Sequence, residues 1–284
     1  MNIPKSKIIP TAFLIFTAIV SLVGGLTLLG ESNAATVPSY EAVDISRLAE
    51  QSNFSLKESA LLWEQTGLSP KILDTIEKKE ERKAILLAAQ KRLFTPAEYH
   101  CDGLALFSKA ELFTDPQSTV PLYDLRPGDV LITKSTHTLC YRHGHSALYL
   151  GEGKLLEAAA IGLPTAITDA AYWGKYPSGL HLRLKESAAA EIHSDVAHIG
   201  AEVAAYAEKE LQNDDYHLLA GAFGIGTATD QTQCAYLVYT AYAHCGIETA
   251  AREFPVTPHA LWESGQFEVL QCWGFDPGDI DRSP

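Results

Sequence analysis

The residue best suited to covalent chemistry is a cysteine at the predicted start of a helix. Residues 232–245 have an apolar helical pattern that ends at Gly246, and Cys234 lies in its first turn. Asp230 or Thr232 is the expected N-cap. Unpaired amides and the helix dipole stabilise a thiolate at such a position, and the same amides can hold a developing oxyanion. The alternatives are a small buried thiol or one half of a disulfide.

A histidine and a glutamate are predicted to meet on a β-hairpin. Residues 145–150 and 154–158 have strand character, and Gly151–Gly153 fits a three-residue loop. In that register His145 and Glu157 are diagonal neighbours on one face of the ribbon. A carboxylate beside an imidazole fixes its tautomer and favours the imidazolium, which is the orienting half of a catalytic triad. The alternative is a surface contact between the two side chains.

The predicted secondary structure that carries these residues changes from helices to short strands along the chain. Residues 40–113 have a helical pattern, whereas the pattern after residue 115 favours short strands. Three early helices are expected: one after the capping box Ser55–Glu58, one from Pro70 to Leu87 behind Ser69, and one from the capping box Thr95–Glu98 to Phe107. Residues 188–211 are alanine-rich and predict a further helix. A helical subdomain followed by a mixed domain is therefore expected.

Composition and charge exclude several classes of function. The chain has 284 residues, of which 46% are hydrophobic and 20% charged, as in a globular protein with a sizeable core. Its formal net charge of −13 argues against a nucleic-acid partner, because phosphate binding needs a basic surface. The sequence lacks a Cys-x-x-Cys pair and the glycine–lysine pattern of a P-loop, so neither a zinc ribbon nor a nucleotide cofactor is predicted.

The N-terminal segment predicts export of the chain. Lys5 and Lys7 precede the uncharged residues 8–29, and the small residues Ser32 and Ala34 favour cleavage after Ala34. An uncharged run of this length can also span a bilayer, so an uncleaved membrane tether through residues 8–29 is the alternative. Both interpretations place the remainder of the chain in the periplasm, the cell envelope or the extracellular space.

Three stretches of the sequence together resemble a known family. They are LRPGDVL at residues 125–131, GHSALYLGEGKLLEA at 144–158 and CAYLVYTAY at 234–242. The first two resemble the histidine half of the NlpC superfamily of papain-like cysteine hydrolases, and the third resembles its cysteine half. The histidine half comes first here, which is the order of the circularly permuted branch with YiiX-like and lecithin:retinol acyltransferase-type proteins. The similarity covers about half of the chain, from residue 123 to residue 267.

The resemblance implies roles for three residues. Cys234 is the expected nucleophile, His145 the general base and acid, and Glu157 the residue that orients the histidine. Ala235 and Tyr236 depart from the serine and the acidic residue that many relatives have at these positions. These departures leave the substrate class open, and they leave room for a member of the family without catalytic activity.

Two tyrosines are expected to bind substrate. Tyr149 shares the predicted face of His145, and Tyr216 precedes a loop that leads to the cysteine helix. No metal is predicted, although His143, His145 and either Glu157 or Glu152 form an alternative set of metal ligands.

The five cysteines leave further alternatives open. Cys101 is a rival nucleophile that lies ahead of the histidine half, in the unpermuted order. An oxidising compartment favours disulfides among Cys101, Cys140, Cys245 and Cys272, and the odd count leaves at least one thiol unpaired.

These observations predict an α+β protein with a circularly permuted papain-like fold. The expected division is a leader or anchor at residues 1–34, a helical subdomain at 35–118, a thiol hydrolase domain at 119–273 and a flexible tail at 274–284. The resemblance and the predicted export make a cell-wall peptide the leading substrate, cleaved at an amide bond. An acylated lipid substrate is the second possibility, and a wall-binding module without turnover is the third.

Overall fold

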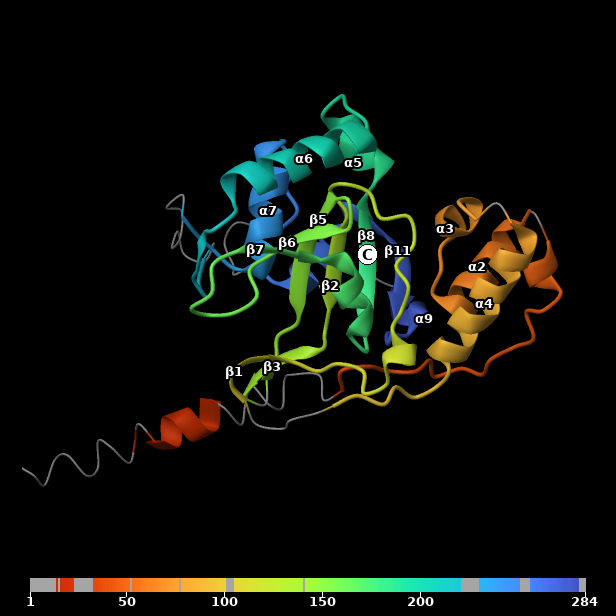
Figure 1. Cartoon of the computed structure of the whole chain (residues 1–284), viewed down its shortest axis with the longest axis horizontal. Coiled ribbons are helices and arrows are strands. Elements are labelled where there is room, and N and C mark those ends of the chain that lie inside the picture. Colours follow the sequence, from red (N-terminus) through yellow and green to blue (C-terminus); the bar gives the residue numbers. More distant parts are fainter. Residues whose placement is uncertain are drawn as a thin grey trace, which may run out of the picture.

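A six-stranded antiparallel sheet lies at the centre of an α+β fold, as the sequence predicts (Figure 1). The computed structural model describes residues 14, 16–22, 33–51, 53–76, 78–100, 105–139, 141–220, 230–250 and 256–280. From edge to edge, the sheet contains β11 (Phe267–Trp273), β8 (Gly179–Leu184), β2 (Val130–Thr133), β5 (His145–Gly151), β6 (Lys154–Glu157) and β7 (Ala166–Asp169).

Smaller elements surround this sheet. A three-stranded sheet contains β1 (Ala105–Ala110), β3 (Thr136–Leu139) and β4 (Tyr141–Arg142), and a parallel pair contains β9 (Asp215–Tyr216) and β10 (Gln231–Thr232). The helices are η1 (Leu48–Glu50), α2 (Leu56–Thr66), α3 (Pro70–Asp74), α4 (Lys79–Leu93), η2 (Pro116–Ser118), η3 (Ala170–Lys175), α5 (Glu186–Glu191), α6 (Val196–Glu210), α7 (Cys234–His244), α8 (Pro258–Glu263) and α9 (Pro277–Ile280).

The two faces of the central sheet bury different sets of side chains. Alternate residues of a strand point to opposite faces. Val130 and Leu148 therefore pack in the core that includes α6 and α7, which Figure 1 shows together on one side of the sheet. Leu131 and Leu155 pack on the other face, around Trp173 of η3. The sheet thus carries a core on both faces, and α7 is fixed against one of them.

The β5–β6 hairpin has the register that the sequence predicts. Leu148 is opposite Leu156 and Tyr149 is opposite Leu155, and the register shifts by one residue only at the turn, where Gly151 is opposite Lys154. Gly151 has a φ of +108° and Glu152 a φ of +50°. These left-handed values allow the chain to reverse within the short loop.

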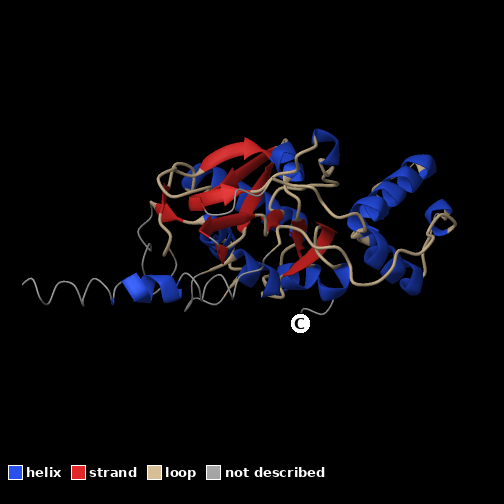
Figure 2. Cartoon of the chain, turned by 90° about the horizontal axis from the view of Figure 1, so that it is seen from below, coloured by secondary structure: helices blue, strands red, loops and turns tan. Residues whose placement is uncertain are grey.

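Helices α2, α3 and α4 form a group beside β11, at one end of the molecule (Figures 1 and 2). The capping box of α2 is present as predicted. The Ser55 side chain accepts from the Glu58 amide, and the Glu58 carboxylate accepts from the Ser55 amide at 2.8 Å. The single helix expected from Pro70 to Leu87 is wrong, because α3 ends at Asp74 and α4 begins at Lys79. At this break, polar side chains donate hydrogen bonds to backbone carbonyls.

Two carbonyls at the break show how it is stabilised. The Thr75 hydroxyl donates to the Ile72 carbonyl at 2.7 Å, and the Arg82 guanidinium donates to the Ile76 carbonyl at 2.7 Å. Ile72 and Ile76 are both buried. The break therefore has side-chain hydrogen bonds to backbone carbonyls on both sides of Thr75, and Ile76 within it is buried.

The third early helix is not formed. Residues 95–100 are not helical, Tyr99 makes an isolated antiparallel bridge to Phe113, and β1 pairs with β3. Pairing with a distant strand overrides the local helical preference of residues 105–107. The helical group consequently ends at Leu93, and the helical part is shorter than the expected residues 35–118.

The C-terminal segment is packed rather than flexible as far as Ile280. Helix α9 lies against α2, where the Trp63 indole N–H donates to the Pro277 carbonyl at 3.3 Å. Pro277 and Ile280 are both buried. The expected flexible tail at residues 274–284 is therefore wrong for residues 274–280, and residues 281–284 lie outside the described part.

Ala34, after which cleavage is predicted, is fully buried in this structure. Its N–H donates to the Tyr99 hydroxyl at 3.2 Å, and its carbonyl accepts from the Ser135 hydroxyl at 3.2 Å. Among the residues that the structure describes, none of the helices is both long enough and apolar enough to cross a bilayer.

Helix α6 makes a close backbone contact with the turn before β2 at Gly200. A substitution at this glycine tests the packing. A Cβ atom added to Gly200 would lie 2.2 Å from the Pro127 carbonyl oxygen, so Gly200→Ala must displace α6 or the turn. We expect Gly200→Ala to lower the free energy of unfolding by about 1–3 kcal/mol, measured by urea denaturation. Glu202→Ala, on the exposed side of the same helix, is the control and should change it by less than about 0.5 kcal/mol. Equal stability of both variants would contradict this packing.

Candidate active site

Helix α7 begins at Cys234, so the sulfur projects from the first residue of the helix. The N-cap is Gln233, whose side-chain oxygen accepts from the Ala235 amide at 2.9 Å and whose side-chain nitrogen donates to the Val256 carbonyl at 2.5 Å. The expected caps are wrong, because Thr232 is used in β10, where it pairs with Tyr216. Gln233 thus fixes the start of the helix from two sides.

The buried side of α7 anchors the cysteine against the central sheet. Leu237, Val238 and Ala241 are completely buried, and α7 packs directly on β5. Cys234 itself is 7% exposed and is a free thiol. The nucleophile predicted from the sequence therefore lies at the end of a rigid element, with its sulfur inside the protein.

His145 and Glu157 form a buried pair, as the predicted hairpin register requires. His145 Nε2 lies 2.7 Å from Glu157 Oε2, and both side chains are less than one-tenth exposed. The other carboxylate oxygen, Oε1, accepts from the Thr168 hydroxyl of β7 at 2.6 Å. The alternative of a surface contact is excluded by this burial, and the imidazole is held in one orientation.

Trp173 completes the support of the imidazole. Its ring is fully buried and stacks on the His145 ring, with centroids 5.5 Å apart and planes 23° apart. Gly144, which precedes His145, has a φ of +72°, and a Cβ atom there would lie 2.9 Å from the Thr133 carbonyl. A glycine is therefore required for the chain to enter β5 with His145 in this position.

The cysteine and the histidine meet across the end of the sheet. The Cys234 sulfur and the His145 imidazole lie close enough for each to shift the pKa of the other. Since Glu157 occupies Nε2, the Nδ1 atom is the ring nitrogen that remains for the sulfur. The order cysteine, histidine, glutamate is that of a nucleophile, a base and an orienting group.

The electrostatics of this chain favour a thiolate and an imidazolium. Burial by itself would lower the pKa of His145, but the hydrogen bonds and charges of Cys234 and Glu157 raise it to about 10. Burial would raise the pKa of the Cys234 thiol, whereas His145 and hydrogen bonds from Ser146 hold it below the ordinary value. Opposite shifts of this kind stabilise the ion pair across neutral pH.

Glu157 remains ionised in spite of its burial. Desolvation would raise the pKa of this carboxyl, but the hydrogen bond and charge of His145, together with the Thr168 hydroxyl, keep it below the ordinary value. The carboxylate therefore supplies the negative charge that keeps the imidazole protonated while the thiol is ionised.

Ser146 is a site residue that the sequence reasoning missed. Its amide and hydroxyl lie near the Cys234 sulfur and help to hold the pKa of that thiol below the ordinary value. The hydroxyl is fully buried and has no hydrogen-bond partner among the described residues. The sequence signal was its position beside His145 in a strand, because alternation turns Ser146 toward the face that α7 covers.

The two tyrosines predicted to bind substrate lie in different environments. Tyr216 pairs with Thr232, two residues before Cys234, and its pKa is raised by burial and by the charge of Cys234. Tyr149 is buried, and its hydroxyl accepts from the Gly153 amide at 3.0 Å, which stabilises the hairpin turn at the opposite end of β5 from His145. The structure therefore brings Tyr216 to the site and gives Tyr149 a structural role.

The alternative set of metal ligands does not converge. His143 Nε2 lies 3.1 Å from the Thr138 hydroxyl and its Nδ1 lies 2.7 Å from the Gly144 carbonyl, so neither nitrogen is directed to His145. Glu152 is exposed and pairs with Lys154 at the hairpin turn. Within the described residues there is no group of three or more histidine, cysteine or carboxylate side chains suited to a metal ion.

Of the other four cysteines, two lie in the described part of the chain and two do not. Cys245 is a free thiol, and Cys272 forms no disulfide with Cys234 or Cys245. The rival nucleophile Cys101, and Cys140, lie outside the described residues.

Comparison with known proteins gives no further assignment: no family model matches the chain, and no curated protein or solved structure is significantly similar to it.

The lowered pKa of Cys234 predicts selective alkylation. At about pH 7 Cys234 should react with iodoacetamide faster than Cys245, whose pKa is raised to about 11 by burial and by the charge of Glu202. As the pH falls through the pKa of Cys234, the thiolate is protonated and its reaction should slow. Mass spectrometry of proteolytic fragments follows each cysteine separately. Equal rates for the two cysteines at neutral pH would contradict the ion pair.

Glu157→Gln tests whether the carboxylate supports the imidazolium. The amide keeps the shape of the side chain but removes its charge, so the pKa of His145 should fall and that of Cys234 should rise. We expect the midpoint of Cys234 alkylation to move upward by about 1 pH unit or more. Glu152→Gln, at the exposed turn of the same hairpin, is the matched control. An unchanged midpoint in Glu157→Gln would show that Glu157 does not act on the pair.

Proposed function

We propose that this protein is an exported cysteine hydrolase that cleaves an amide bond through an acyl-enzyme on Cys234. The observation that carries the proposal is the buried 2.7 Å pair of His145 and Glu157, with the Cys234 sulfur close enough to His145 for each to shift the pKa of the other. Each neighbour shifts the pKa of the next in the direction that a thiol hydrolase needs.

The first half of the proposed reaction forms an acyl-enzyme on Cys234. The Cys234 thiolate attacks the carbonyl carbon of the substrate, and the carbonyl oxygen becomes an oxyanion. The Cys234 amide, which donates to no described residue, is the helix N–H available to that oxyanion. His145 then transfers its proton to the leaving amine, and the thioester of Cys234 remains.

The second half of the reaction reverses the proton transfer. His145, now neutral, removes a proton from a water molecule as the water attacks the thioester carbonyl. The acid product leaves, Cys234 regains its thiolate, and His145 regains its proton. Glu157 remains ionised throughout and keeps the imidazole in position.

The proposed fold is a circularly permuted papain-like domain. Three features support it: a histidine on the second strand of the sheet in chain order, a cysteine helix later in the chain, and packing of that helix on the histidine strand. The sequence resemblance and the predicted leader support a periplasmic, extracellular or envelope location with a cell-wall peptide as substrate.

A second substrate class is favoured by a specific observation. Ile161 and Leu163 are more than half exposed in the loop that follows Glu157, and Leu218 and Leu219 are exposed just after Tyr216. Exposed apolar side chains on loops that begin beside the catalytic residues suit the acyl chain of a lipid. Hydrolysis or acyl transfer on an acylated lipid is therefore the second candidate.

Turnover of defined substrates tests the proposal. Purified wall peptides should be cleaved, and Cys234→Ala and His145→Ala should each reduce kcat/KM by about a thousandfold or more. Intact-mass spectrometry after acid quenching should show an acyl adduct on Cys234. Cys245→Ala, at the opposite end of α7, is the control and should retain activity.

Other outcomes distinguish the remaining candidates. Cleavage of acylated lipids but not of wall peptides would establish the second substrate class. Binding of wall fragments without cleavage, and without an adduct, would identify a non-catalytic binding module. Unchanged turnover in Cys234→Ala would remove Cys234 from the mechanism altogether.

A further inference from the structure

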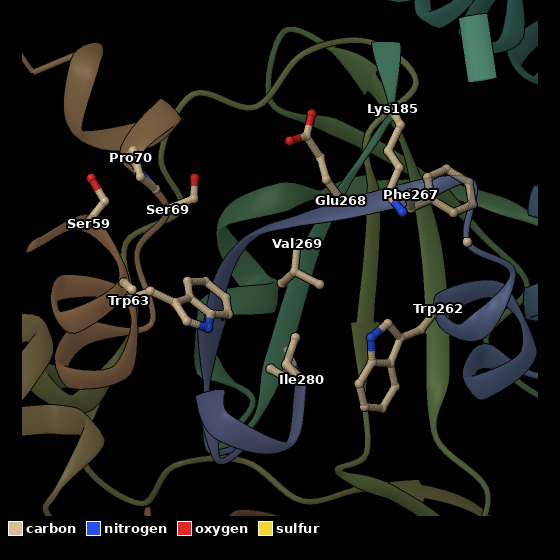
Figure 3. A pocket seen from close by; sticks show the side chains of 12 residues that line it. Ser59, Trp63, Ser69, Pro70, Lys185, Trp262, Phe267, Glu268, Val269 and Ile280 are labelled. Carbon is tan, nitrogen blue, oxygen red and sulfur yellow. The ribbon is translucent and has the colours of Figure 1, made fainter. Parts of the chain in front are cut away.

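A cavity lies on the opposite edge of the sheet from the hairpin. Its volume is about 400 Å³, and it lies between the helical group, β11 and α8 (Figure 3). Trp63, Ser69, Lys185, Trp262, Phe267 and Glu268 are among its lining residues. None of the residues around Cys234 lines this groove, and the proposed hydrolysis does not use it.

Strand β11 forms one side of the groove through Phe267, Glu268 and Val269. Strand β11 is the last strand of the sheet, and only one half of its outer edge is covered. Gly67 accepts from the Cys272 amide at 2.7 Å, and the Ser69 amide donates to the Leu270 carbonyl at 2.9 Å. No described residue outside the sheet makes a backbone hydrogen bond to residues 267–269.

Pro70 is the residue at which the chain stops covering the outer edge of β11. Residues 67–69 run beside β11 as a short antiparallel strand, with Leu68 opposite Gln271. Pro70 is the first residue of α3, so the chain turns away at that point. The next positions along this line, opposite residues 267–269, coincide with the groove. An extended segment about three residues long fills such a gap, at about 3.3 Å per residue.

The direction of that segment follows from the existing pairing. A strand that continues residues 67–69 runs antiparallel to β11, from Val269 toward Phe267. Its carboxyl end therefore arrives beside Phe267, where Figure 3 shows the side chain of Lys185. Lys185 is held there because its amide donates to the Gln266 carbonyl at 2.9 Å.

The charges in the groove fit an incoming carboxylate. Glu268 is already paired with Lys71 at 2.7 Å. Lys185 makes no ion pair with any described residue, and its side chain is only partly exposed. The groove therefore presents one ammonium group without a counter-ion at the end where an added strand would terminate.

The aromatic side chains fit a peptide better than a sugar. Trp63 is 6% exposed, and its indole N–H is used on the Pro277 carbonyl, so it offers little open ring face for stacking. Trp262 is partly exposed, and Figure 3 places it on the other side of the groove from Trp63. The two rings thus leave an apolar slot for one side chain of an added strand.

We propose that this groove binds an extended peptide as an additional strand along residues 267–269, with the free C-terminal carboxylate of the peptide at Lys185. The backbone of β11 supplies hydrogen bonds, the slot between Trp63 and Trp262 takes an apolar side chain, and the ammonium group selects the carboxylate. The site is independent of the chemistry at Cys234.

Calorimetric titration of the full-length Cys234→Ala protein tests the proposal without hydrolysis of the probe. The probe is an acetylated tetrapeptide of threonine, valine, threonine and phenylalanine with a free carboxylate. We expect it to bind about tenfold more tightly than its C-terminal amide, because the amide cannot pair with Lys185. The same peptide, methylated on its central amide nitrogens, should lose binding because it cannot form the strand hydrogen bonds.

Two substitutions locate the binding. Lys185→Gln should remove the preference for the acid over the amide, whereas Lys209→Gln, an exposed lysine on α6, should keep it. Trp262→Leu should weaken acid and amide alike. Equal binding of the acid and the amide, full binding of the methylated peptide, or binding of an oligosaccharide but not of the peptide would each overturn the proposal.

Discussion

The site depends on a buried ion pair that neither partner could maintain alone. Removing the Cys234 thiolate or the His145 imidazolium from water is unfavourable, and burial opposes the charged form of both. The pKa shifts favour the charged forms because each charge offsets the desolvation of the other and because Glu157 pairs with His145 Nε2. A buried pair of this kind requires that all partners be held in place before the charges form.

The surrounding fold supplies that rigidity from two directions. The sheet holds His145 and Glu157 on neighbouring antiparallel strands, with a hydrogen bond from Thr168 on the next strand and the ring of Trp173 behind. The helix holds the sulfur, and its start is fixed by Gln233. The ion pair forms where these two rigid systems meet, so its geometry is set by the packing of α7 on β5.

The parts of the site predicted from the sequence are those that depend on local rules. The hairpin register follows from the two glycines of a three-residue loop, and it places Glu157 beside His145 with no knowledge of the tertiary structure. The start of α7 was placed within one or two residues by its apolar pattern, although the capping residue was wrong because β9 pairs with β10 and withdraws Thr232 from that role.

The rest could not be predicted because it depends on residues distant in the chain. Strand β1 forms where a helix was expected because β3 provides a partner. Trp173 reaches His145 only once η3 folds over the sheet, and no spacing in the sequence indicates that contact. The buried C-terminal helix α9 likewise depends on Trp63, more than two hundred residues earlier.

The segment from Val256 to Glu263 contacts both the start of the cysteine helix and the groove beside β11. At one end, the Val256 carbonyl receives the hydrogen bond that fixes the cap of the cysteine helix, and Pro258 packs beside Gly144. At the other end, Trp262 forms a wall of the groove beside β11. Helix α8 is a single short helix between these points. Its position must therefore satisfy both the cap of the cysteine helix and the wall of the groove.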